Sequence, residues 1–132
     1  MATYPHMKAG EAAVWERFLR ALPFAATSID YDVRLGEGAQ LPPDVPEWVR
    51  NMAWALSTKR VDAVVHTPTA VVLVEVKARA SLSAVGQLLS YEVLYRQQFH
   101  PTKAMRRLIV AESIAPDMAP VLQTYGIELA LV

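Results

Sequence analysis

Cysteine is absent from the 132-residue chain. Its absence excludes disulfides, zinc–thiolate sites and thiol nucleophiles, so that any chemistry depends on carboxylates, histidines and hydroxyls. The chain also lacks an apolar run that approaches the roughly 18 residues of a membrane span, and its first residues lack the basic and then apolar plan of a signal peptide. We therefore expect a cytoplasmic protein without a membrane segment.

Net charge is also missing, because 13 basic residues balance 13 acidic ones, and this balance argues against an indiscriminate nucleic-acid binder. The distribution is uneven, however: residues 30–47 contain five acids and one base, whereas residues 59–107 contain eight bases and three acids. Attraction of a polyanion would therefore depend on a local basic patch or on another subunit. A hydrophobic content of 53% indicates a globular chain, and its length suits one domain over residues 1–132.

Two apolar runs dominate the middle of the chain, at residues 61–65 and 70–76. They are separated by His-Thr-Pro-Thr and predict two buried strands joined by a tight turn. The charged residues of this region are Asp62, Glu75 and Lys77, and a buried charge is costly unless it is paired or binds a metal. The short turn places Asp62 opposite Glu75, and the strand period places Glu75 and Lys77 on one face. We therefore expect the three charged groups to converge.

The rest of the chain predicts helices and strands that alternate around this hairpin. Helices are expected at residues 9–22, after a capping box of Asp44 and Glu47, at 82–99 and at 114–125, and further strands at 29–35, 107–111 and 127–132. This order predicts an α/β fold in which helices flank a mixed sheet. In the helix after Asp44, Trp54 projects away from the apolar face that includes Trp48 and Met52, and we expect another part of the protein to cover it. In the helix at 82–99, Gln87 and Tyr91 share a face.

Glu11 lies on the same face of the first predicted helix as Val14, Trp15 and Phe18, whereas Glu16 points away from it. An acid on a core-facing side has two explanations. It belongs to the same charged site, or it is a first-turn carboxylate that complements the helix dipole. The helix by itself favours the second explanation.

Asp62, the run Glu75-Val76-Lys77 and the pair Gln87-x-x-x-Tyr91 resemble, in this order, the motifs of the PD-(D/E)XK nuclease superfamily and of its branch with a Gln-x-x-x-Tyr helix. Many DNA-processing exonucleases belong to that branch. The resemblance implies a restriction-endonuclease-like core and a metal-dependent deoxyribonuclease. One residue departs from the pattern, because Val61 stands where the motif name has proline, a change that the family tolerates since only the acid contacts metal.

The resemblance also implies roles for individual residues. Asp62, Glu75, the main-chain carbonyl of Val76 and Glu11 would bind Mg²⁺ or Mn²⁺, which are hard cations that prefer oxygen ligands. Lys77 would orient or help to deprotonate the attacking water and stabilise the charge that develops on phosphorus. These assignments make the hairpin and the first helix the metal-binding part of the site.

Further residues would bind the substrate, which the resemblance implies to be DNA. Gln87 and Tyr91 would shape the site and contact the scissile strand. Lys59, Arg60 and Arg79 flank the site and are candidates for contacts to phosphates, although exposed charges kept for solubility explain them equally well. The resemblance is compatible with a homodimer, as in junction resolvases, or with a component of a mobile-element, phage or repair system. The alternative function is a nuclease-fold module that binds nucleic acid or protein without cleavage.

Overall fold

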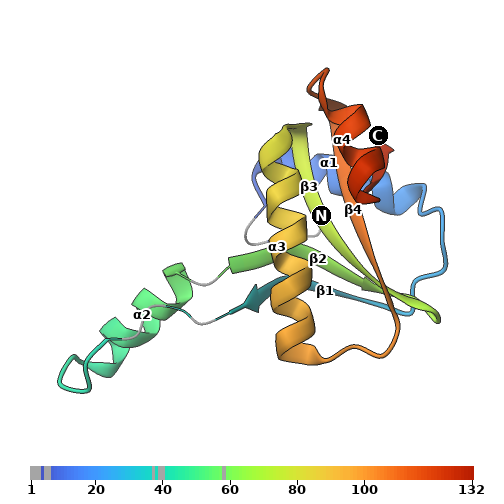
Figure 1. Ribbon diagram of the computed structural model, residues 1–132. Coiled ribbons are helices and arrows are strands. Elements are labelled where there is room, and N and C mark those ends of the chain that lie inside the picture. Colours follow the sequence, from blue (N-terminus) through green and yellow to red (C-terminus); the bar gives the residue numbers. More distant parts are fainter. Residues whose placement is uncertain (1–3, 5–6, 37, 39–40, 58) are drawn as a thin grey trace.

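The computed structural model describes residues 4, 7–36, 38, 41–57 and 59–132, and a five-stranded sheet organises them (Figure 1). The elements follow one another as α1 (Ala9–Arg20), β1 (Ser28–Leu35), α2 (Glu47–Ser57), β2 (Lys59–His66), β3 (Ala70–Ala80), α3 (Leu82–Phe99), β4 (Ala104–Ile114), α4 (Met118–Tyr125) and β5 (Glu128–Leu131). The strands lie in the same order across the sheet, β1 to β3 antiparallel and β3 to β5 parallel. The predicted α/β class with a mixed sheet is therefore confirmed.

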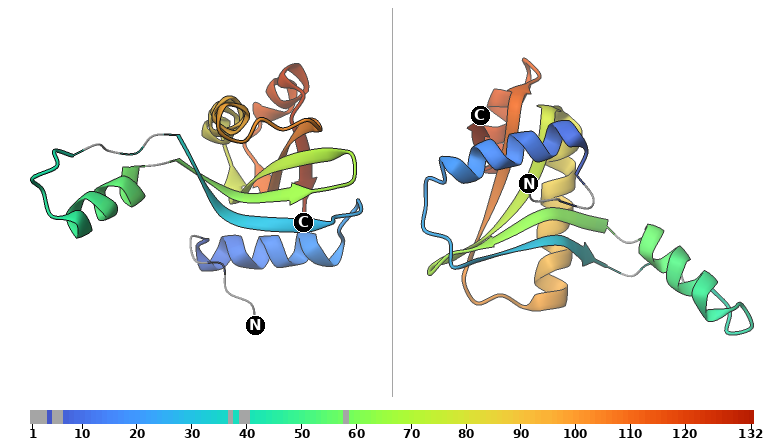
Figure 2. Two further views of the ribbon diagram at one scale, coloured as in Figure 1. Left: turned by 90° about the horizontal axis from the view of Figure 1, so that it is seen from below. Right: turned by 180° about the vertical axis from the view of Figure 1, so that it is seen from behind.

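Helices cover both faces of the sheet (Figure 2). α1 packs on one face through the buried side chains of Val14, Trp15 and Phe18. α3 and α4 cover the other face, where Leu88 and Met118 belong to a second core. β2 and β3 lie between these layers, which explains their continuous runs of valine, since a strand buried on both faces does not alternate. Within the described chain, no helix has the length and apolar character needed to span a bilayer.

The helix α3 has the bounds that the sequence predicts, whereas the central strands are longer than predicted. β3 continues past its apolar run, so that Lys77 pairs with Ala111 and Arg79 with Ser113 of β4. The sequence pattern ends too early because charged side chains interrupt the apolar run, although their backbone still belongs to the sheet. α4 begins at Met118 instead of residue 114 because Ile114 still belongs to β4 and residues 115–117 form the turn between the two elements.

The segment between β1 and β2 projects from the sheet, and we call its described residues 41–57 the arm (Figures 1 and 2). α2 forms most of the arm and packs extensively against no other helix or strand of the described chain. The prediction of a capping box that starts at Asp44 is wrong. The helix begins at Glu47, directly after Pro46, whose carbonyl accepts hydrogen bonds from the amides of Val49 and Arg50.

Candidate active site

The candidate site lies where β2 and β3 separate. The antiparallel pairing of the two strands ends with Ala63 opposite Val74. Beyond this pair a side chain, and not the main chain of β2, accepts the hydrogen bond from β3. The main-chain N–H of Val76 donates a hydrogen bond of 2.8 Å to Asp62 Oδ2. This contact holds the carboxylate against β3. Continuation of the register places Asp62 opposite Glu75, which agrees with the arrangement expected from the turn length.

Glu75 is a buried acid in the middle of β3 and is only 2% exposed. Its burial, a hydrogen bond with the Asp62 side chain and the negative charge of Asp62 raise the pKa of Glu75 to about 10, against the opposing charge of Lys77. Glu75 therefore keeps its proton at neutral pH. Among the described residues, Glu75 Oε2 has no hydrogen-bond partner. A buried oxygen without a partner costs stability, so the position of Glu75 needs an explanation other than folding.

Lys77 lies on β3 at the point where the strand leaves the core. Its side chain is partly exposed, and the two residues that follow it are exposed. Alternate residues of a strand lie roughly 7 Å apart on one face, which places Lys77 beside Glu75. The positive charge of Lys77 lowers the pKa of Glu75, so the ammonium group is within electrostatic reach of the carboxyl pair. A cation and two acids thus meet at the fork between β2 and β3.

The helix α3 brings Gln87 and Tyr91 to the same place. Burial and the charges of Glu75 and Asp62 raise the pKa of the Tyr91 hydroxyl, while a hydrogen bond with Gln87 opposes the rise. Tyr91 therefore stays protonated and offers a neutral donor beside two acids. Gln87 Oε1 is buried without a hydrogen-bond partner in the part of the chain that the structure describes. These two side chains form a polar wall of the site that carries no charge of its own.

Glu11 lies at the edge of the site. Its charge contributes to the raised pKa of Glu75, so it is within electrostatic reach of that carboxyl group. Its Oε1 accepts a hydrogen bond of 3.2 Å from the main-chain N–H of Lys8 and thereby completes a capping box at the start of α1. The helix-terminal contact is the one expected from the dipole explanation. No group of three or more acids or histidines among the described residues is arranged to hold a metal ion, so the pair of Asp62 and Glu75 is the centre of the site.

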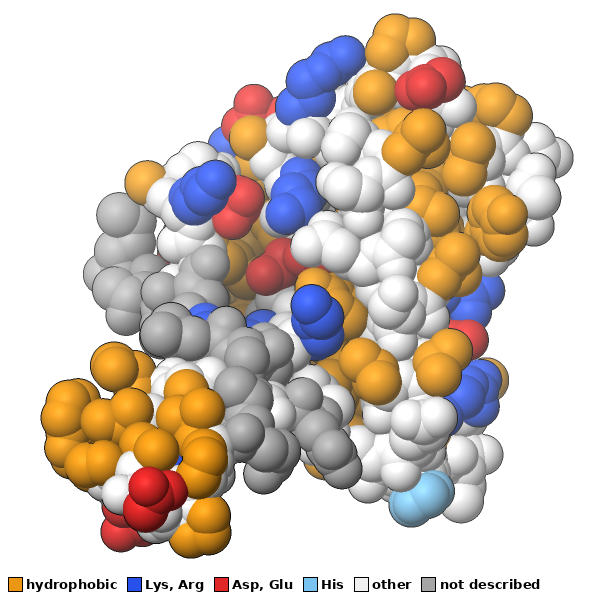
Figure 3. Space-filling view, turned by 60° about the vertical axis from the view of Figure 1, so that its left-hand side comes forward, with side chains coloured by type: hydrophobic (Ala, Val, Ile, Leu, Met, Phe, Trp, Pro, Cys, Tyr) orange, Lys and Arg blue, Asp and Glu red, His pale blue; other side chains and the backbone are white. Residues whose placement is uncertain are grey.

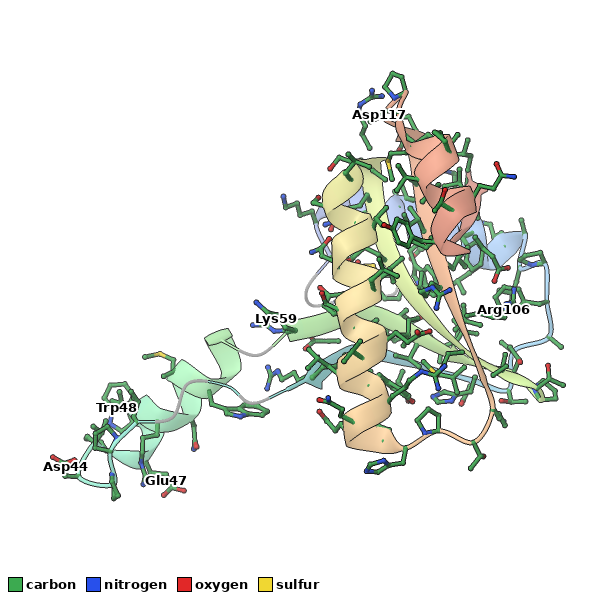
Figure 4. The ribbon with its side chains drawn as sticks, in the orientation of Figure 1. Asp44, Glu47, Trp48, Lys59, Arg106 and Asp117 are labelled. Carbon is green, nitrogen blue, oxygen red and sulfur yellow. The ribbon has the colours of Figure 1, made fainter. Side chains whose placement is uncertain are left out.

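The basic residues predicted to contact DNA differ in their surroundings. Lys59 is exposed at the start of β2, near the base of the arm (Figure 4). Arg79 is also exposed, and its Nη1 donates a hydrogen bond of 3.5 Å to Ser113 Oγ. Arg60 forms an ion pair with Asp32 across β1 and β2, at 3.9 Å. Lys59 and Arg79 are thus exposed enough to contact a phosphate, whereas the guanidinium of Arg60 pairs with an acid of the neighbouring strand.

The fold is shared with solved structures of nucleases. The chain is similar to a repair endonuclease from Pyrococcus abyssi, with 15% identity and a TM-score of 0.51, over 100% of this chain and 49% of that one. It is also similar to EndoMS in its apo form, with 17% identity and a TM-score of 0.51, over 96% of this chain and 47% of that one. The chain therefore spans about half the length of these proteins. At such identities the likeness shows the restriction-endonuclease-like fold. No family model and no curated protein matches the chain.

Asp32 is a residue of this region that the sequence pattern misses. Alternation assigns it to the solvated face of its strand. In the structure its φ is 52°, in the left-handed region that residues other than glycine rarely adopt. Its neighbours in β1 pair with the residues on either side of Asp62, so Asp32 lies level with Asp62 where the pairing of β1 with β2 is interrupted. The sequence contains one indication of this conformation, because aspartate adopts the left-handed region more readily than most residues.

Proposed function

We propose that this chain is a divalent-metal-dependent nuclease that hydrolyses phosphodiester bonds of DNA. The observation that carries the proposal is the contact between the buried carboxyl group of Glu75 and that of the partly buried Asp62, with Lys77 beside them. A folded core gains no stability from two acids in contact. The arrangement is therefore best explained by a cation that binds to both carboxylates when the protein is active. The fold shared with repair endonucleases supports the same conclusion.

Mg²⁺ or Mn²⁺ suits the donor atoms of this site. The carboxylates of Asp62 and Glu75 and the main-chain carbonyl of Val76 would hold it, and Glu11 would hold a water molecule beside it. Hard cations prefer oxygen ligands, and Glu75 Oε2 is a buried oxygen without a partner among the described residues. When bound, such a cation lowers the pKa of a water ligand and neutralises charge on a phosphate oxygen.

The remaining residues would act on the water and on the DNA. Lys77, held beside Glu75, would orient the attacking water and stabilise the charge that develops at phosphorus. Gln87 and Tyr91 would position the scissile strand as neutral hydrogen-bonding groups, which do not repel a phosphate as an additional carboxylate would. Lys59 and Arg79 would contact neighbouring phosphates and so set the position of the strand.

Incubation with plasmid and with single-stranded DNA, each with and without Mg²⁺ or Mn²⁺, tests the proposal. We expect cleavage only with metal, and a loss of at least about 100-fold in Lys77→Ala. Lys103→Ala is a matched control. Lys103 lies at the opposite end of the sheet, where its Nζ donates a hydrogen bond of 2.9 Å to the carbonyl of Thr67, so its replacement should leave cleavage intact.

A titration with Mn²⁺ tests the ligand assignment separately from activity. Asp62→Asn should weaken Mn²⁺ binding, and an unchanged affinity would refute the role of Asp62 as a ligand. Cleavage that persists in a chelator would refute metal dependence. Tight binding of DNA without cleavage, in the wild type as in Lys77→Ala, would indicate the alternative function of a nuclease-fold module that binds without cutting.

A further inference from the structure

The arm exposes large apolar side chains. Trp48 is 69% exposed, Met52 50% and Leu41 37%. Figure 3 shows hydrophobic side chains over much of the arm in that view, with acidic side chains at one end. Scattered apolar residues on a surface are ordinary, but a contiguous patch rimmed by charge is typical of an interaction site.

The arm has little support from its own chain. α2 has 11 residues, and helices of this length are marginal in water without packing partners. Trp54 attaches the base of the arm, since it lies against Gly38 and the guanidinium of Arg34 is 5.8 Å from its ring centroid. The expectation that Trp54 is covered is therefore met in part, at 38% exposure, whereas Trp48 lies further out on the arm (Figure 4). None of the residues that the structure describes covers Trp48.

Charge favours a protein surface over DNA as the cover. The arm, residues 41–57, contains two acids and one base, a net charge of −1, and the chain as a whole is neutral, so the other residues carry +1. Asp44 and Glu47 lie beside Trp48 on the outer part of the arm (Figure 4). These acids repel a polyanion, whereas they attract an apolar surface that is flanked by bases.

We propose that the arm of one chain packs on α3 of a second copy, and that the reverse contact completes a two-fold symmetric dimer. α3 exposes Val93 and Phe99, with Arg96 between them along the helix; Arg96 is half-exposed and forms an ion pair of 3.8 Å with Glu92. At 100° per residue Phe99 lies on one flank of α3, and Leu94 and Gln98 lie on the other, where they line a hollow of about 520 Å³ together with Gly36, the residue directly after β1. This surface is apolar and hollowed and has one partly exposed base, Arg96, whereas the arm is apolar and projects with two acids near its outer end.

The exposed area distinguishes this arrangement from a contact between two arms. From their exposed fractions, Trp48, Met52 and Leu41 offer about 340 Å² of accessible surface on each arm. A reciprocal contact covers both arms and equal areas of the two α3 surfaces, about 1,400 Å² in total, which is within the range of specific interfaces. Arms that cover only each other would bury about 700 Å², the size of an incidental crystal contact.

Disulfide trapping tests the contact directly, because the chain contains no cysteine of its own. Chains that carry only Met52→Cys are mixed with chains that carry only Val93→Cys and are oxidised without DNA. We expect a mixed disulfide dimer in high yield. The matched control replaces Val93→Cys by Ala13→Cys, an exposed position of α1 on the opposite face of the sheet, and should give little product. Efficient dimers of Met52→Cys alone would show arm-to-arm contact and overturn the proposal.

Light scattering after gel filtration tests the same proposal with an unmodified chain. We expect the wild type at about 100 μM to have twice its mass of 14.6 kDa and Trp48→Ser to be monomeric, with Tyr125→Ser as an exposed aromatic control that remains dimeric. Glu47→Arg and Arg96→Glu should each weaken the dimer at least about 10-fold, and the double variant should recover it. A monomeric wild type, or a dimeric Trp48→Ser, would overturn the proposal. If Trp48→Ser keeps the mass of the wild type but no longer binds DNA, the proposal is also overturned, and the arm is a DNA-binding surface.

Discussion

Replacement of Glu75 by glutamine should leave the metal-free protein at least as stable as the wild type at neutral pH. The Glu75 carboxyl group is buried and bonded to Asp62, and its pKa is raised far above the ordinary value of 4.5. The folded wild type therefore keeps the proton of Glu75 at pH 7. Glutamine has nearly the shape of a protonated carboxyl group and adds no charge. We expect the free energies of unfolding of the two proteins to agree within about 1 kcal/mol at pH 4.5, and that of Glu75→Gln to be higher by up to about 3 kcal/mol at pH 7.

The pH dependence of stability sets the magnitude of the effect. Between pH 4.5 and about 10 the unfolded chain has released the proton of Glu75 and the folded chain has not. The free energy of unfolding therefore falls as pH rises, by at most about 1.4 kcal/mol per pH unit. The contribution is complete below pH 4.5 and is lost as pH passes through the folded pKa. From pH 6 to pH 9 the upper limit is about 4 kcal/mol, and Glu75→Gln lacks this loss.

Urea denaturation at pH 6, 7, 8 and 9 in a chelator measures the difference between the two proteins. Glu112→Gln is the matched control, because Glu112 is an exposed acid paired with Arg17, and such pairs contribute less than about 1 kcal/mol. Addition of Mg²⁺ should stabilise the wild type more at pH 9 than at pH 6, and should have little effect on Glu75→Gln. Equal pH dependence in the wild type and in Glu75→Gln would refute a protonated Glu75, and with it the argument for a cation at this pair.

Two further predictions concern residues outside the carboxyl pair. Asp32→Gly should be tolerated because glycine adopts a φ of 52° without strain, whereas Asp32→Val should lose about 1–3 kcal/mol; circular dichroism melts measure both, and a fully stable Asp32→Val would contradict the strain. Glu92→Gln should lose about 1–3 kcal/mol because it leaves the largely buried Arg107 guanidinium without its acid, whereas Arg96→Ala, which loses an exposed pair at 3.8 Å, should cost less than about 1 kcal/mol. Urea denaturation compares the two, and equal losses would contradict the difference in burial.

The hairpin and α3 were predictable because local sequence determines them. Continuous valines and a short turn specify two buried strands, and the turn length sets the register that brings Asp62 opposite Glu75. α3 ends at Phe99, where His100 adopts a left-handed conformation before Pro101, so its C-terminal boundary is also readable from the sequence. The convergence of the charged groups was predictable because these groups lie on the two strands of the hairpin.

The arm and the surroundings of Glu11 could not be predicted because they depend on which surfaces meet. The period of α2 identifies an apolar face, but it does not say what that face contacts, and the exposure of Trp48 shows that the described residues leave part of it uncovered. The period of α1 places Glu11 toward the core in the same way, but it does not predict the contact with the Lys8 amide. The backbone of Asp32 is likewise determined by its neighbours in the sheet rather than by its own residue type.

The position of the site connects the two proposals. Glu75 and Lys77 lie on β3, which is paired with β4 on both sides of them, whereas Asp62 lies on β2, only three residues after Lys59 at the base of the arm. The two acids therefore belong to different halves of the sheet, and the half with Asp62 carries the arm. If a second copy holds the arm, it also restrains Asp62 relative to Glu75. Mn²⁺ affinity should then rise with protein concentration in the wild type and stay constant in Trp48→Ser, and a concentration-independent affinity in a proven dimer would show that arm and site act separately.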